Sequence, residues 1–278
     1  LTATTSSGLQ AVAFGFPFKG GDEVLVPLGE FPSNAWPWLA LRDRGVSFRE
    51  VPLWEGHRGG ALALDSAPPQ GELEAEDRIL RAISGRTRLV SVSWVRFQDG
   101  LRLNLTRLAE GCRSKGVPLV VDGIQGCGTH AVDLTGVSAF ATGGHKGLLS
   151  PQGLGFLWTD PTFRARLLPA GTWLSVDQGT DFSRPSTDFD RAFLEDGRRL
   201  EPGSPPLLMA AALQASLKEL NGAGVAKIQA HVEALQRGLL RRLAEGPWAG
   251  EAARLSALLE ADHLGPILAF HHGGRDLQ

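Results

Sequence analysis

The sequence predicts an α/β fold in which a mostly parallel sheet carries helices on both of its faces. The chain has 278 residues, of which 42% are hydrophobic and 21% charged, and this is enough for one large core or two domains. Strand-like runs rich in Val and Leu alternate with helix-like runs. Such alternation is typical of a parallel sheet, in which a helix follows each strand and covers the sheet.

The expected elements follow one another along most of the chain. Strands are expected at residues 23–27, 47–53, 88–95, 118–122, 139–143 and 155–159. Helices are expected at residues 7–16, 32–44, 73–83, 105–114, 206–220 and 225–244. Asn104 stands directly before the fourth helix, so we interpret it as an N-cap rather than as a glycosylation acceptor.

Two parts are expected. Residues 1–205 would form a large domain, and residues 206–278 would form connecting helices and the start of a small C-terminal α+β domain. Glycines and prolines at 56–71 predict a surface loop. The chain opens on Leu1 and closes soon after a strand-like run at 266–270, so we interpret it as a fragment that lacks both ends.

Composition argues against several classes of protein. The formal net charge of -2 gives no reason to expect nucleic acid or an anionic membrane as a partner. The sequence has no run of about 18 apolar residues that could span a membrane, and no secretory signal. The two cysteines, Cys112 and Cys127, cannot make a disulfide framework, which favours a cytoplasmic location.

Polar side chains stand where predicted strands end. Ligands of an open parallel sheet bind beyond the carboxyl ends of its strands. The fourth strand is followed by Asp122 and Gln125, and the fifth by His145 and Lys146, while Thr5, Ser6 and Ser7 open the first helix. We expect these three places to converge on one crevice.

Pyridoxal 5′-phosphate (PLP) is a cofactor that requires such a set. It needs a lysine that holds it as a Schiff base, a carboxylate against its pyridine nitrogen, donors for its phosphate and a flat group over its ring. Lys146, Asp122, residues 5–7 and Phe31 can fill these roles in that order.

Two motifs carry a family resemblance. Val121-Asp122-Gly123-Ile124-Gln125, then Gly144-His145-Lys146-Gly147 with its continuation to residue 156, resemble the class V aminotransferase family of fold-type-I PLP enzymes, which includes cysteine desulfurases. Residues 95–102 and 171–173 resemble the branch nearest isopenicillin-N epimerase-like proteins. The likeness extends from Thr4 to about Leu243, with the pieces in the expected order.

The resemblance implies a role for each site residue. Lys146 is the Schiff-base lysine, Asp122 pairs with the pyridinium nitrogen, and Gln125 binds the phenolic oxygen of PLP. Phe31 stacks on the ring, at a place where desulfurases carry a histidine. Thr5 and Ser6 serve the phosphate, with Thr142 and His145 as further candidates, and His145 is also a candidate catalytic residue. The Ser204 hydroxyl reaches the phosphate of a neighbouring subunit. Gly143 departs from the family pattern, because desulfurases usually place a phosphate-binding Ser or Thr there.

Each residue also has a purely structural interpretation. Asp122 would cap a turn, Ser6 or Ser7 would cap the first helix, and Phe31 would belong to the core. His145 would be a packed histidine, Ser204 would end a strand beside two prolines, and Cys127 would be a small buried side chain. The pair His271-His272 is a poor metal site, since adjacent strand residues point to opposite faces. Trp173 is expected near the substrate.

The function expected from the resemblance is that of a PLP-dependent transferase acting on an amino acid or another amine, with a homodimeric assembly. An aminotransferase-like reaction is our first choice, and a cysteine desulfurase, epimerase or lyase reaction is the alternative. In desulfurases the nucleophilic cysteine and the carboxylate-binding arginine lie on the C-terminal domain, so this chain does not decide between them. A different class of hypothesis is a non-catalytic remnant of the fold.

Overall fold

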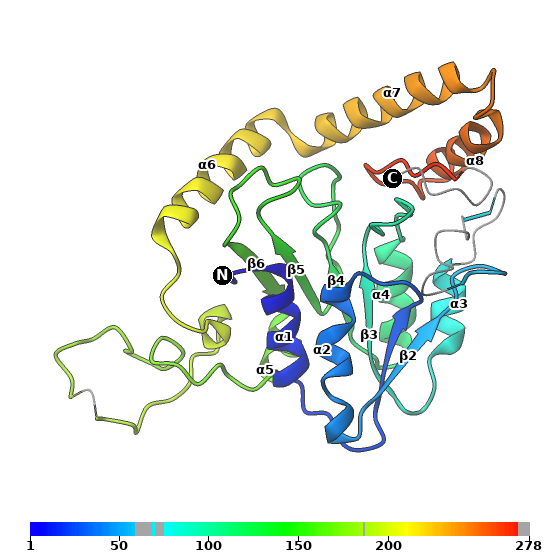
Figure 1. The fold of residues 1–278 in the computed structure, drawn as a ribbon. Helices are drawn as coiled ribbons and strands as arrows, with labels where there is room; N and C mark the ends of the chain where they lie inside the picture. The colour runs from blue at the N-terminus through cyan, green and yellow to red at the C-terminus, as the bar shows by residue number, and fades with distance from the viewer. Residues whose placement is uncertain (59–67, 70–74, 186, 272–278) are drawn as a thin grey trace.

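A single sheet organises the chain (Figure 1). The computed structural model describes residues 1–58, 68–69, 75–185 and 187–271. Within these residues the strands follow the order β2-β1-β3-β4-β5-β6, and all neighbours are parallel except β6, which runs antiparallel to β5. The strands are β1 (Glu23–Pro27), β2 (Ser47–Val51), β3 (Thr87–Ser93), β4 (Leu119–Asp122), β5 (Ala139–Gly143) and β6 (Gly155–Thr159). The predicted α/β class with a mostly parallel sheet is confirmed.

Helices cover both faces of the sheet because alternate strand residues point to opposite sides. In β1, Val24 and Val26 pack into one buried cluster with Leu9 of α1, whereas Leu25 packs into a second cluster with Ile79 of α3. The helices are α1 (Thr5–Gly15), α2 (Trp36–Leu39), α3 (Ala75–Ala82), α4 (Leu105–Ser114), α5 (Pro161–Ala165), α6 (Leu207–Ala223), α7 (Val225–Leu243) and α8 (Ala249–Glu260). Each strand face thus removes apolar surface from water on its own side of the sheet.

The helix predicted at residues 32–44 is broken into short pieces. A 3-10 turn at Pro32–Asn34, the one-turn helix α2 and a second 3-10 turn at Arg42–Arg44 replace it. Pro37 stands in the first turn of α2, where its missing N–H costs nothing, and Gly45 ends the segment with a φ of 74°. The Asn104 N-cap is confirmed, because its side chain accepts a hydrogen bond from the Arg107 N–H at 3.0 Å.

The end of the chain differs from the expectation in two ways. The helix α8 was not predicted, and its Leu255, Leu258 and Leu259 belong to the same core cluster as Leu25. Residues 266–270 form no strand, although Ile267 packs against that cluster. The division of the chain at residue 205 stays a prediction. The loop expected at 56–71 lies largely outside the described residues.

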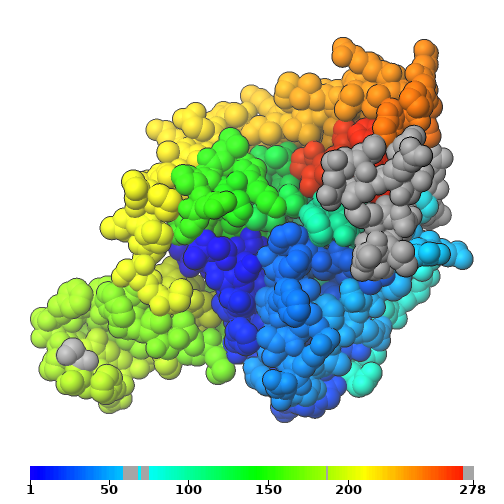
Figure 2. Space-filling view, in the orientation of Figure 1, coloured from blue at the N-terminus to red at the C-terminus, as the bar shows by residue number. Residues whose placement is uncertain are grey.

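An arm of residues 170–196 projects from the body of the molecule, at the lower left of the space-filling view (Figure 2). It follows α5 and contains little regular structure. Two of its aromatic side chains, Phe182 and Phe189, are 85% and 86% exposed. In the part of the chain that the structure describes, no helix combines the length and the apolar character needed to cross a membrane.

Candidate active site

The site is assembled where parallel strands end. Ser93 at the end of β3 pairs in register with Asp122 at the end of β4, and Asp122 pairs with Ala141 near the end of β5. The turn after β1 brings Glu30 onto Ser93, whose backbone N–H donates to the Glu30 carboxylate at 2.7 Å. Groups that are far apart in the sequence therefore meet at one edge of the sheet, as expected for this fold class.

Asp122 is a buried carboxylate with a perturbed proton affinity. Only 3% of the residue is exposed, and its Oδ1 accepts a hydrogen bond from the Ile124 N–H at 3.0 Å. Burial raises the pKa of Asp122 to about 7, with Glu30 adding to the rise while the Ile124 N–H and Lys146 oppose it. A carboxylate that is costly to ionise by itself gains most from a cation placed against it.

Lys146 lies close to the face of Phe31. The distance from Lys146 Nζ to the centroid of the Phe31 ring is 5.7 Å, and Phe97 packs against Phe31 in a T-shaped arrangement with ring centroids 5.1 Å apart. Lys146 sits in a tight turn after β5. This turn packs so closely against the Cys127 backbone that a Cβ on Gly147 would stand 2.3 Å from the Cys127 carbonyl oxygen. This close approach explains the glycine that follows the lysine.

The start of α1 offers hydrogen-bond donors beside the same edge. Thr4, rather than Ser6 or Ser7, is the N-cap, and it forms a reciprocal capping box with Ser7. The Ser6 hydroxyl donates to the Ser33 hydroxyl at 2.7 Å, which ties the helix start to the turn that carries Phe31. The Thr5 hydroxyl oxygen is buried without a hydrogen-bond partner in the structure.

The other predicted cofactor residues lie in the same loops with different exposure. Gln125 is partly buried three residues after Asp122, and His145 is exposed directly before Lys146. Thr142 is fully buried, and its hydroxyl donates to the Gly143 carbonyl at 3.2 Å. A Cβ on Gly143 would lie 3.1 Å from His145 Nδ1, so the departure at Gly143 makes room for this histidine ring.

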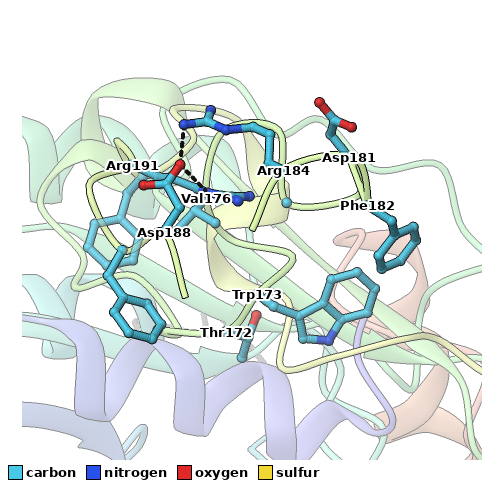
Figure 3. Close-up of a pocket in the computed structure, with 12 residues that line it drawn as sticks. Thr172, Trp173, Val176, Asp181, Phe182, Arg184, Asp188 and Arg191 are labelled. Atoms are coloured by element: carbon cyan, nitrogen blue, oxygen red, sulfur yellow. Dashed lines mark hydrogen bonds and ion pairs between the residues drawn. The ribbon is translucent and has the colours of Figure 1, made fainter. Parts of the chain in front are cut away.

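Two expected residues lie in other cavities. Ser204 is exposed and lines a cavity of about 190 Å³ together with Leu1, Thr2 and Ala3, just before α1. Trp173 lies in the arm, where it lines a cavity of about 650 Å³ with Phe182 and other side chains (Figure 3). Trp173 therefore does not meet Lys146 among the described residues of this chain.

The arm cavity is built on charge pairs within the arm. Asp188 binds both Arg184 and Arg191, which the dashed lines of Figure 3 mark. Cys112 is buried and Cys127 is half-buried, and burial raises the pKa of Cys112 to about 12 and that of Cys127 to about 11. Neither thiol is poised as a nucleophile.

Glu30 is the site residue to which the sequence reasoning gave no role. It stands directly before Phe31, and its carboxylate contacts both the N–H and the hydroxyl of Ser93. The signal that could have found it is an acidic residue in the turn after a fully buried strand, three residues beyond Pro27, on the side of the sheet where Asp122 was expected. Its partner is 63 residues away, and that separation hides the contact from the sequence.

Comparisons with known proteins agree with this geometry. The model of the family described as Aminotransferase class-V matches residues 1–251. The chain is 32% identical over 237 residues to a probable cysteine desulfurase of Methanothermobacter thermautotrophicus, covering 83% of this chain and 53% of that protein. It is 28% identical to the uncharacterized aminotransferase YcbU of Bacillus subtilis, covering 88% and 60%.

A solved structure has the same fold. A mutant of C-DES, with glycine covalently linked to its PLP cofactor, superposes with a TM-score of 0.72 at 24% identity, and the match covers 89% of this chain and 62% of that chain. The chain thus spans little more than half the length of the curated relatives that it matches.

Proposed function

Because the chain belongs to the Aminotransferase class-V family, we propose that it is part of a PLP-dependent enzyme that acts on an amino acid or another amine. The observation that carries the proposal is the buried carboxylate of Asp122 at the sheet edge, under the electrostatic influence of Lys146. A lysine that holds the cofactor and a carboxylate that keeps its ring nitrogen protonated are a recurrent pair in PLP sites.

The residues present fit the cofactor in three respects. The Thr5 hydroxyl is a buried polar atom in need of a partner, and it lies in the first turn of α1, where free N–H groups favour a phosphate. Asp122 is desolvated and would be stabilised as an anion by a pyridinium N–H. Phe31 is 38% exposed and presents a flat apolar face toward Lys146.

Each residue would have a defined task in catalysis. When bound, PLP supplies an aldehyde carbon that condenses with amines and a ring that accepts electrons from the substrate α-carbon. Lys146 Nζ would hold the cofactor covalently and, once displaced by the substrate amine, would take the proton from the α-carbon. Asp122 would keep the ring nitrogen protonated by its charge. Phe31 would orient the ring and exclude water from its face.

An aminotransferase-like reaction is our first choice, with a cysteine desulfurase, epimerase or lyase reaction as the alternative. We keep both reactions as candidates because one relative is named a probable cysteine desulfurase and another an uncharacterized aminotransferase. A non-catalytic remnant is the rival of another class. We propose further that the protein is cytoplasmic, on the ground that both cysteines are free thiols.

A two-fold homodimer is the assembly that we propose, with Ser204 serving the phosphate of its partner. The exposure of Ser204 leaves its hydroxyl accessible to a partner subunit, which supports this role. When Lys146→Ala and Ser204→Trp chains are mixed, one site of each heterodimer carries both lesions and the other carries neither, because a two-fold contact is reciprocal. Activity should therefore return, to at most about one competent site per heterodimer. Lack of recovery despite proven subunit exchange would place Ser204 outside the partner's site.

PLP uptake by the purified chain tests the function. The wild-type chain should retain a yellow absorbance after desalting, whereas Lys146→Ala should not. Lys115→Ala is a matched control, since Lys115 is an exposed lysine at the end of α4 and should behave as wild type. Equal colour in wild type and Lys146→Ala would refute the assignment of Lys146, and a colourless wild-type chain would favour the remnant.

A further inference from the structure

Glu30 joins the turn after β1 to the end of β3 by two hydrogen bonds. The Ser93 N–H donates to Glu30 Oε1 at 2.7 Å, and the Ser93 hydroxyl donates to Oε2 at 2.5 Å. Ser93 is 6% exposed and pairs in register with Asp122. Both oxygens of one carboxylate are therefore used on a single residue at the centre of the site edge.

The turn that Glu30 holds is the one that carries Phe31. Its preceding residue, Gly29, has a φ of 72°, and a Cβ there would stand 3.0 Å from the Gln98 side chain. The Phe31 ring packs in a T-shaped arrangement against Phe97, and Lys146 Nζ lies over its face. The Phe31 ring is still 38% exposed, so side-chain packing alone does not fix where it stands.

The charges around Glu30 show that its position is costly. Burial raises the pKa of Glu30, and the hydrogen bonds from Ser93 oppose this rise, followed by the charge of Arg96. An apolar side chain in its place would leave the N–H and the hydroxyl of buried Ser93 without this acceptor. Glu30 also raises the pKa of Asp122, which places the two acids within electrostatic reach of each other.

We propose that Glu30 is a positioning residue that clamps the turn at residues 28–34 to Ser93 and so holds Phe31 against the cofactor ring. This inference rests on the proposed function for the cofactor, while the clamp itself is a property of the chain alone. Glu30 touches neither cofactor nor substrate in this account; it acts through Phe31. Removal of the clamp should let the Phe31 ring move away from Lys146.

The test compares Glu30→Ala, Glu30→Gln and Ser93→Ala with wild type, with PLP as the added ligand. The visible circular dichroism of bound PLP reports the orientation of its ring, and the rate of PLP release reports how firmly the ring is held. Glu30→Ala should weaken the dichroism per bound PLP and speed release about tenfold, the effect of losing two hydrogen bonds. Glu30→Gln keeps an acceptor for the Ser93 N–H and should stay close to wild type, with Ser93→Ala in between.

Glu50→Ala is the matched control. Glu50 is an exposed acid on β2 that reaches the same turn only through a 3.5 Å contact with the Gly29 N–H, and its loss should change neither signal. A role in folding alone would lower the melting temperature of Glu30→Ala but leave the dichroism of bound PLP unchanged, and that result would overturn the proposal.

Amide hydrogen exchange without PLP separates this inference from the proposed function. The Ser93 amide and the turn at 28–34 should exchange about tenfold faster in Glu30→Ala than in wild type. If wild type takes up no PLP, the proposed function fails, and faster exchange would still establish the clamp. Wild-type exchange in Glu30→Ala would refute the clamp whatever the cofactor does.

Discussion

Two buried acids stand at opposite ends of the parallel strands and differ in the number of groups that compensate their charge. Glu23 begins β1 and is 1% exposed, and Asp122 ends β4 and is 3% exposed. Glu23 accepts hydrogen bonds from the Thr87 hydroxyl at 2.7 Å and the Ser84 hydroxyl at 3.3 Å. Arg49 and Arg86 add cationic nitrogens at 3.6 and 3.8 Å.

Asp122 has far less compensation for its burial. The Ile124 N–H donates to it at 3.0 Å, the nearby charge of Lys146 favours ionisation, and Glu30 works against it. An acid with a complete set of partners stabilises a fold, whereas an acid that lacks them costs stability and is suited to a partner that arrives later. This difference in compensation distinguishes the amino ends of the strands, where Glu23 has a structural role, from their carboxyl ends, where Asp122 is suited to a function.

The largest expected effect is on catalysis. Asp122→Asn keeps the shape of the side chain but removes the charge that would hold the ring nitrogen protonated. Exchange of the α-proton of an amino acid for deuterium, followed by proton NMR in the PLP-loaded protein, should slow about a hundredfold or more. Glu23→Gln is the matched isostere at the other end of the strands and should stay within about threefold of wild type. Near-normal exchange in Asp122→Asn would mean that another group serves the ring.

The reverse contrast is expected for stability. Glu23→Gln removes the charge that two hydroxyls and two guanidinium groups now face, and it should lower the free energy of unfolding by about 2 kcal/mol. Asp122→Asn in the cofactor-free chain should leave the free energy of unfolding at pH 7 equal or higher, because it removes a carboxyl that is costly to ionise. Urea unfolding of both variants measures this. A larger loss of unfolding free energy in Asp122→Asn than in Glu23→Gln would contradict the structural role of Glu23 and the functional role of Asp122.

The dependence of stability on pH gives the most specific effect. The folded pKa of Asp122 is raised from 3.8 to about 7, so its contribution to stability is complete below pH 3.8 and is lost as the pH rises toward 7. The pKa values of His57 and His130 are lowered to about 4 by burial, and they act in the opposite direction over pH 4 to 6.5. The dependence of wild-type stability on pH therefore combines the opposing effects of Asp122 and the two histidines.

Subtraction of one variant isolates Asp122. The free energy of unfolding of cofactor-free Asp122→Asn should gain on wild type by at most about 1.4 kcal/mol per pH unit between pH 5 and 7, and by only about 0.4 kcal/mol more above pH 7. Urea titrations at pH 5, 6, 7 and 8 measure the difference. A constant difference across this range would show that Asp122 ionises with an ordinary pKa in the folded chain.

Prediction from the sequence succeeded where a local pattern determines the structure. The apolar runs of β1, β5 and β6 gave the strand bounds, and Asp122 and Lys146 lie at or just after strand ends as expected. Their roles toward a cofactor, which follow from the rule that ligands bind beyond strand ends, stay a prediction. It failed for residues 32–44, where helical composition concealed the effect of Pro37. Periodicity also cannot reveal a contact such as that between Glu30 and Ser93, because it joins residues that only the sheet order brings together.

The central claim is that Lys146 is the lysine that holds the cofactor. Borohydride reduction of the PLP-loaded chain fixes a pyridoxyl group on the lysine that carries it, and mass spectrometry of the digested protein locates that group. The account predicts a single labelled lysine, Lys146, with no label at Lys19, Lys115, Lys218 or Lys227. A pyridoxyl group on any other lysine, with Lys146 unmodified, would contradict it.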